Sequence, residues 1–246
     1  MELIDLFLGN YGSCNRDCAA ALRINPRNVK AWYRSASACL ALDKIDEAED
    51  ACNRGLEVDD KNQALVLLSG RISKRKQQLA ELDRKRRERE ERAKKEKATL
   101  KLALKSRNIP TRTTPKGPDM EDAAMALEDP LNPASTLQIP VVFLYPAHLQ
   151  SDFIKAFLES ESVGQHLTQV MPLPWDEAHE YTPEDVECYV ETISGGLIKA
   201  GKRLSLLRIL ASGKVELVDG MLKINVLPKN KASGWVEEFK KQHRRS

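Results

Sequence analysis

The sequence predicts a mainly helical N-terminal region followed by an α+β domain with a mostly antiparallel sheet. Three observations predict this fold class. A motif recurs after 34 residues near the N-terminus, helix-forming residues without proline extend from Asn62 to about Arg107, and apolar runs separated by turn residues follow Ile139. We therefore expect four parts: a helical repeat region at 1–70, a long charged helix at 71–107, a proline-rich linker at 108–138 and a C-terminal domain at 139–246.

The repeated motif keeps one offset along its whole length. Tyr11–Asn25 aligns with Ile45–Asp59, and Asn28 aligns with Asn62, always 34 residues apart. This period is typical of tetratricopeptide repeats, which are helical hairpins that stack into a superhelix with a concave groove. Fewer than two full hairpins fit, so we expect that the chain opens inside a helix and has a truncated or alternative start. The other interpretation is that the long following helix caps the repeats.

Small residues stand where such hairpins need close approach. Ala36 and Ala48 occupy the contact between the two helices of one hairpin, and Ala21 and Gly55 the contact between consecutive hairpins. Pro26 lies between hairpins because proline cannot continue the preceding helix. The pattern predicts a helix from Val29 to Leu42.

Lys30 and Arg34 are the candidate binding residues of the repeat region. They are four residues apart on the predicted helix, so they share one face, and the repeat pattern directs that face into the groove. Two neighbouring cations repel each other unless an anion lies between them, and a guanidinium with an ammonium suits a peptide carboxylate. The alternative interpretation is an ordinary solvated face of the helix.

The long helix carries most of the positive charge. Between Arg71 and Arg107 there are 16 Lys and Arg against 6 Asp and Glu, whereas the whole chain carries only +3. Leu65, Leu68 and Ile72 can dock the start of this helix on the last repeat, and the remainder reads as a solvated spacer. Nucleic-acid binding is the alternative, although the run lacks interleaved aromatic residues.

The sequence contains no pattern of a catalytic, metal or cofactor site. The five cysteines occupy apolar repeat positions or lack a nucleophile signature, so we expect reduced thiols, no metal and no cofactor. Neither a signal peptide nor an apolar run of about eighteen residues is present, which favours the cytosol or nucleus and no membrane partner. His148, His166, His179 and Cys188 are scattered, and we expect a protein that is not an enzyme.

The C-terminal domain is expected to mix strands and helices. Ile139–Pro146 is a continuous apolar run, typical of a buried strand, and Asp219-Gly220 predicts a hairpin turn between 214–218 and 221–226. Further strands are expected at 186–192 and 205–210. Helices are expected after Ser151, with Phe153, Ile154, Phe157 and Leu158 on one face, at 235–243, and as a short segment at 120–127. Trp175 is either an exposed anchor for a partner or a core residue.

Together these segments resemble the tetratricopeptide repeat protein four family, which are co-chaperones of heat shock protein 90 with a C-terminal wheel domain. The matching segments, which extend over nearly the whole chain, are Asn25–Ala36, Leu127–Pro133, Phe143–Pro146, Ser151–Phe157, Pro172–Trp175, Glu187–Tyr189 and Gly195–Lys199.

The resemblance implies a function and a site. It implies that the repeats bind the acidic C-terminal tail of heat shock protein 90, with heat shock protein 70 as a second partner, and that the chain assists the folding of client proteins. Lys30 and Arg34 match the part of a two-carboxylate clamp that the third repeat contributes. The asparagine of the second repeat would fall immediately before Met1, so only half of the clamp is expected in this chain. A nucleic-acid-associated scaffold acting through the basic helix remains the alternative function.

Overall fold

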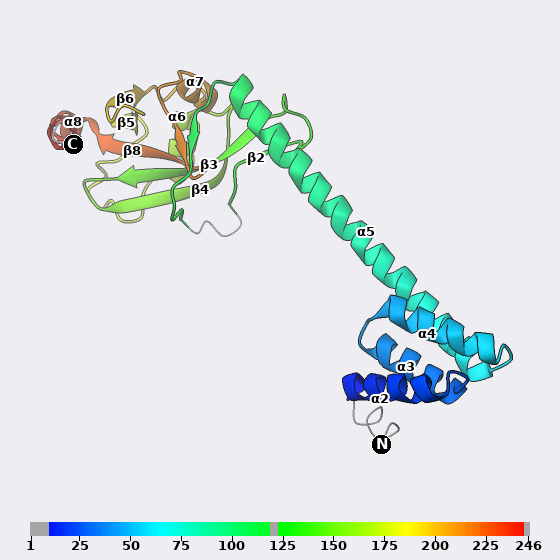
Figure 1. Ribbon diagram of the computed structural model, residues 1–246. Coiled ribbons are helices and arrows are strands. Elements are labelled where there is room, and N and C mark those ends of the chain that lie inside the picture. The colour runs from blue at the N-terminus through cyan, green and yellow to red at the C-terminus, as the bar shows by residue number, and fades with distance from the viewer. Residues whose placement is uncertain (1–9, 119–122, 244–246) are drawn as a thin grey trace. The chain divides into compact units, whose positions relative to one another are not determined.

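The computed structural model describes residues 10–118 and 123–243, whose contacts divide the chain into two compact units, Met1–Glu91 and Arg92–Ser246. The first unit is helical and the second is α+β, which confirms the predicted fold class (Figure 1). The expected helix at the chain start lies outside the described residues. Within the described ranges, no helix is both long and apolar enough to cross a membrane.

The first unit consists of three helices and the start of a fourth. They are α2 (Tyr11–Ile24), α3 (Val29–Ala41), α4 (Ile45–Val58) and α5 (Gln63–Ser106). Asn28 and Asn62 occupy equivalent positions of the 34-residue repeat because both side chains cap a helix. Asn28 accepts a hydrogen bond from the amide of Ala31, and Asn62 accepts one from the amide of Leu65, each at 3.2 Å. The repeat period therefore marks equivalent helix starts.

The small residues lie where helices approach closely, as the repeat pattern predicts. Ala36 of α3 and Ala48 of α4 are fully buried in the core of the first unit. At Gly55 of α4, an added Cβ atom would come within 2.8 Å of a methyl group of Leu65 and 3.1 Å of the Cβ atom of Trp32. A side chain at position 55 would therefore press on both helices that pack against α4.

Helix α5 changes character along its length. Leu65, Leu68 and Ile72 are buried in the core of the first unit, as expected for a docking stripe. From Leu82 onwards the helix is mostly exposed, and several of its acids pair with cations three or four residues away, as in Asp83–Arg87 at 2.8 Å. The last turns of α5 are buried again, because Ala103 and Leu104 belong to the core of the second unit.

The second unit is built on a six-stranded, mostly antiparallel sheet. Its strands are β2 (Ala126–Leu127), β3 (Leu137–Tyr145), β4 (Gln150–Leu158), β5 (Val186–Glu191), β6 (Leu197–Ala200) and β8 (Leu222–Pro228). The strand order is β2-β3-β8-β5-β6, and β4 also pairs with β3. Among the described strands of this sheet, β3 and β8 form the one parallel pair. The predicted buried strand is therefore β3, which lies inside the sheet with Val141 and Phe143 fully buried.

The helix expected after Ser151 is wrong, because this segment is strand β4. Opposite β4, the residues Ile139 and Val141 of β3 pair with Phe157 and Ile154, so β4 holds one extra residue between its two partners. This bulge puts Ile154 and Phe157 on the same face of the sheet although they are three residues apart. Their spacing therefore imitates that of a helix.

Two other segments also differ from the expectation. Residues 205–210 are not a strand: after Ser205 they form the short helix α7 (Leu206–Leu210), whose buried side chains Leu206, Ile209 and Leu210 have helical spacing. The short helix expected at 120–127 is contradicted where the structure describes it, since Ala126–Leu127 is strand β2, and residues 120–122 lie outside the described ranges.

One helix has a sequence signal that the periodicity did not reveal. Helix α6 (Val163–Val170) starts with a capping box, in which Ser162 caps the amide of Gln165 and the Gln165 side chain accepts from the Ser162 amide at 2.7 Å. The closing helix is confirmed but begins earlier than expected, as α8 (Lys229–His243), which packs against β8 and β5.

The Asp219-Gly220 turn forms as predicted and also anchors the proline-rich segment. The expected hairpin between 214–218 and 221–226 is wrong, because among the described residues a single bridge, Val218–Met221, joins its two sides, and Leu217–Val218 belongs to a separate two-stranded sheet. Asp219 and Gly220 have positive φ, 54° and 76°, and connect β7 (Leu217–Val218) to β8. The Asp219 carboxylate accepts hydrogen bonds from the amide and the hydroxyl of Thr114, both at 2.7 Å, which lowers its pKa. Strand β7 also pairs in parallel with β1 (Thr111–Arg112). The start of the proline-rich segment is thus fixed to the second unit, whereas the domain limits expected from the sequence remain predictions.

Candidate functional site

The candidate residues Lys30 and Arg34 lie in the first two turns of α3. Asn28 caps this helix, and the indole of Trp32 donates a hydrogen bond to the carbonyl of Pro26 at 2.8 Å, which ties the helix start to the preceding loop. Lys30 is exposed and Arg34 is half-buried. Their spacing puts both on one face of α3, with the side chains about one helical turn apart.

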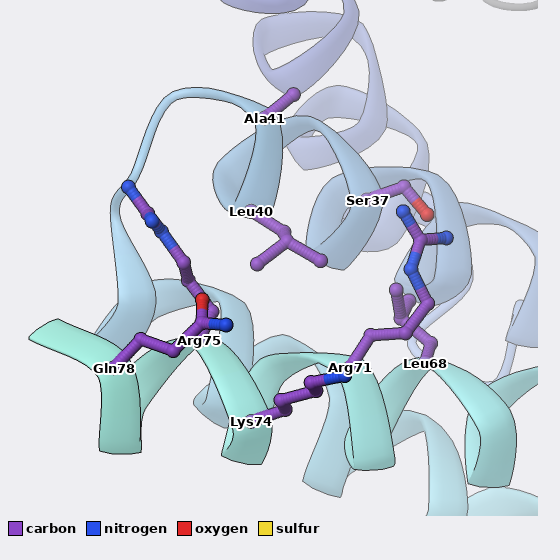
Figure 2. Close-up of a pocket in the computed structure, with 8 residues that line it drawn as sticks. All are labelled: Ser37, Leu40, Ala41, Leu68, Arg71, Lys74, Arg75 and Gln78. Carbon is purple, nitrogen blue, oxygen red and sulfur yellow. The ribbon is translucent and has the colours of Figure 1, made fainter.

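The same face of α3 continues into a pocket of about 380 Å³ between α3 and the start of α5. Ser37 and Ala41 follow Lys30 and Arg34 at helical spacing, and both line the pocket together with Leu40. From α5 come Leu68, Arg71, Lys74, Arg75 and Gln78 (Figure 2). The pocket therefore extends the surface that carries the two candidate residues.

Carboxylates of the α3–α4 hairpin neutralise two cations near this pocket. Arg75 forms a forked ion pair with Asp43, at 2.8 and 2.5 Å, and its hydrogen bonds hold the pKa of Asp43 below its ordinary value. Lys76 pairs with Glu49 of α4, and this hydrogen bond raises the pKa of Lys76. These ion pairs hold α5 against the hairpin. Because Arg75 and Lys76 are already neutralised, they offer little positive charge to an anionic ligand.

Three cations remain without such a partner. Within the part of the chain that the structure describes, no carboxylate pairs with Lys30 of α3 or with Arg71 and Lys74 of α5. Sequence reasoning counted Arg71 and Lys74 with the solvated helix, because nothing in the charge run separates them from it. Their helical spacing to the buried Leu68 was the available signal that they face α3.

The five cysteines are free and buried, as expected for packed thiols. They are Cys14, Cys18, Cys39, Cys52 and Cys188. Burial raises the pKa of Cys39 and Cys52, and the Cys52 thiol donates to the carbonyl of Leu65 at 3.3 Å. Among the described residues, no three His, Cys, Asp or Glu side chains come together as a metal site would require.

The histidines of the second unit make separate contacts. His166 bonds to Glu161 at 2.8 Å and stacks on Phe157, whereas His179 is exposed in a loop with φ of 51°. Cys188 of β5 is fully buried, and burial raises its pKa to about 12. A buried thiol of this kind holds its proton and is a poor nucleophile.

Trp175 belongs to an aromatic cluster instead of standing free on the surface. Its half-buried ring packs edge-on against Tyr145 and Tyr181, with centroids 5.1 and 5.2 Å away, and lies 5.1 Å from the ring of His148. The hydroxyl of Tyr145 donates to Asp152 at 2.7 Å. Most of the Trp175 ring is therefore covered by these aromatic side chains, which favours the interpretation of Trp175 as a core residue.

Two sequence families match the chain. Residues 129–239 match the Cns1/TTC4 Wheel domain, and residues 9–72 match a tetratricopeptide repeat family. The relatives include the "Hsp70/Hsp90 co-chaperone cns1" of Schizosaccharomyces pombe, 35% identical over 243 residues that make up 96% of this chain and 67% of that protein. The Saccharomyces cerevisiae protein of the same name is 34% identical and covered to 64%, and mouse "Tetratricopeptide repeat protein 4" is 32% identical and covered to 53%.

Solved structures agree with these matches. The "Hsp90 co-chaperone Cns1 from Saccharomyces cerevisiae (delta69)" has a TM-score of 0.82 and 32% identity, over 98% of this chain and 80% of that one. The separate C-domain of the same yeast protein has a TM-score of 0.56 and 33% identity, over 60% of this chain and 94% of that one. The chain thus spans between about half and two thirds of the length of the curated relatives it matches.

Proposed function

This chain belongs to the Cns1/TTC4 family, and on that premise we propose that it is a non-enzymatic co-chaperone whose helical unit binds the acidic C-terminal tail of heat shock protein 90. Heat shock protein 70 is the second partner. The names of the relatives support both chaperones as partners. The observation that carries the proposal is the position of Lys30 and Arg34, one turn apart on the face of α3 that leads into the pocket.

The chemistry of this face suits a peptide carboxylate. The guanidinium of Arg34 can form a planar fork with one carboxylate, and the ammonium of Lys30 adds a compact charge beside it. Asn28 and the bond from Trp32 to Pro26 fix the first turn of α3, which keeps Lys30 in place relative to Arg34.

The experiment is a titration of the full chain with a C-terminal peptide of heat shock protein 90. We expect the Lys30→Ala/Arg34→Ala variant to bind at least about tenfold more weakly, because each lost charge-assisted contact is worth about 1.5 kcal/mol or more. The control is Arg89→Ala/Lys94→Ala, which removes two charges from the exposed part of α5, where no described carboxylate pairs with them. Equal losses in both variants would show a general charge effect and contradict the site.

The second unit is proposed to act on client proteins. Its core is separate from that of the helical unit, so tail binding and client contact can reside in different parts of one chain. We expect the chain to assist the refolding of a denatured enzyme by heat shock protein 90, and the Lys30→Ala/Arg34→Ala variant to lose this effect. The cytosolic or nuclear location expected from the sequence stays a prediction.

A further inference from the structure

The pocket beside Lys30 and Arg34 has its own unmatched charge. Arg71 and Lys74 are exposed on the α5 wall, and no carboxylate among the described residues pairs with either. Their neighbours Arg75 and Lys76, by contrast, are engaged by Asp43 and by Glu49. The hairpin therefore neutralises Arg75, which also lines the pocket, whereas among the described residues it supplies no carboxylate for Arg71 and Lys74.

The walls of the pocket also offer a hydroxyl and an apolar floor. Figure 2 shows the Arg71 side chain reaching from α5 toward Ser37 of α3, with Lys74 one turn further along α5. Leu40 and Leu68 line the space between the two helices, and Leu68 is almost fully buried. The combination suits an acidic residue next to an apolar one and not a uniformly charged polymer.

The distance to the candidate carboxylate site fits a short extended peptide. Ser37 follows Lys30 by seven residues, which at 1.5 Å per residue is about 10 Å along α3. An extended chain covers about 3.3 Å per residue, so about three residues separate a carboxyl terminus held at Lys30 and Arg34 from the pocket.

We propose that Arg71 and Lys74, with Ser37 beside them, form a second anion subsite that binds acidic side chains two and three residues before the C-terminal residue of a tail. Leu40 and Leu68 then hold the apolar residue that precedes these acids. The subsite rests on the proposed function, because it assumes that the terminal carboxylate is held on α3. It makes the groove selective for acid-rich tails over other free C-termini.

The test uses four peptides with the full chain at low salt. The first is Gly-Ser-Gly-Leu-Glu-Glu-Ala-Asp with a free carboxyl terminus, and the second has both glutamates replaced by glutamine. The third and fourth are the amidated forms of these two. Each peptide is titrated into the wild type, into Arg71→Gln/Lys74→Gln and into the control Arg89→Gln/Lys94→Gln, and glutamine is used because it is a good helix former that keeps α5 intact.

The expected result is a preference that depends on Arg71 and Lys74. The wild type and the control should bind the glutamate peptide roughly three- to tenfold more tightly than the glutamine peptide, as expected for two exposed ion pairs. In Arg71→Gln/Lys74→Gln the two peptides should bind within about twofold of each other, and circular dichroism should show unchanged helix content.

Two results would overturn the subsite. A wild type that does not discriminate between the two peptides, or an unchanged preference in Arg71→Gln/Lys74→Gln, means that these cations do not contact the acids. If amidation still weakens binding in that case, only the subsite is wrong. If amidation has no effect in the wild type, the carboxylate site on α3, and with it the proposed function, is wrong as well.

Discussion

Arg107, the residue that follows α5, joins three segments of the second unit. Its guanidinium donates to both oxygens of Glu159 at 2.7 and 2.8 Å, and to the carbonyls of Pro133 and Ser135, each at 2.7 Å. The side chains of Arg107 and Glu159 are only 12% and 9% exposed. This buried fork holds the end of α5, the proline-rich segment and the end of β4 together.

We predict that Arg107→Ala destabilises the second unit by about 3–5 kcal/mol, because it leaves the Glu159 charge and two carbonyls buried without their donor. Urea unfolding followed by circular dichroism measures the loss. The matched control is Arg112→Ala, whose ion pair with Glu216 at 2.9 Å involves a 56% exposed arginine and should cost less than about 1 kcal/mol. Similar losses in the two variants would refute the assignment of Arg107 as a buried joint.

A second residue prediction compares Gly55 and Gly70 of the helical unit. At Gly55 a Cβ atom would press on buried Leu65 and on Trp32, so Gly55→Ala should lower the free energy of unfolding by about 1 kcal/mol or more despite its better helix propensity. At Gly70 of α5 nothing lies within 4 Å of an added Cβ atom, so Gly70→Ala should raise stability by about 0.5–1 kcal/mol. Changes of the same sign in the two variants, measured by urea unfolding followed by circular dichroism, would contradict the packing.

At the scale of elements, the sequence predicts what periodicity alone decides. The repeat offset locates the helices of the first unit, because α4 begins and ends 34 residues after α2, and α5 begins 34 residues after α3. The caps Asn28 and Asn62 keep the same offset. Strand β4 escapes this reasoning because its bulge, which exists only through pairing with β3, spaces Ile154 and Phe157 like helix positions. Helix α7 is too short for periodicity to separate from a strand.

The residues of the candidate site also differ in whether the sequence could predict them. Lys30 and Arg34 can be assigned to one face from spacing alone, because helix geometry is local. The pocket wall of Arg71 and Lys74 requires the packing of α5 beside α3, a contact between distant segments that no local pattern contains. The capping box at Ser162 shows the opposite case, a local signal for α6 that periodicity does not use.

The sheet of the second unit should make its stability sensitive to alkali. Burial raises the pKa of Cys188 of β5 to about 12, from an ordinary value of 9.0, and raises that of Tyr181 to about 12. The folded state therefore holds these protons more tightly than the unfolded state. Their contribution to stability is complete below about pH 9 and is lost as the pH rises toward 12.

We expect the wild type to lose about 1–2 kcal/mol more stability between pH 8 and pH 10 than Cys188→Ala does, because the variant has no thiol to ionise on unfolding. Urea midpoints at both pH values give this difference, and comparing the changes with pH removes the effect of the cavity that the variant creates. Equal pH dependence in the two proteins would show that Cys188 is not held protonated by burial.

At the scale of the whole molecule, the chain combines two units with separate cores. The helical unit presents the face of Lys30 and Arg34, and the α+β unit carries the match to the Cns1/TTC4 Wheel domain. Helix α5 contributes apolar residues to both cores, whereas its middle is exposed and its acids form ion pairs with some of its many cations. Most of the basic run that dominates the charge of the chain is therefore a solvent-exposed part of the helix. The cations that we propose to bind a ligand are Arg71 and Lys74 at the start of this run and Lys30 and Arg34 on α3.

The most direct test of the central claim is a coupling measurement between the tail carboxylate and α3. A heat shock protein 90 C-terminal peptide, with a free or an amidated carboxyl terminus, is titrated into the wild-type chain and into Lys30→Ala/Arg34→Ala. We predict that amidation raises the Kd for the wild type at least about tenfold and that for the variant by less than about twofold. An equal effect of amidation on both proteins would contradict the claim that Lys30 and Arg34 hold the carboxylate.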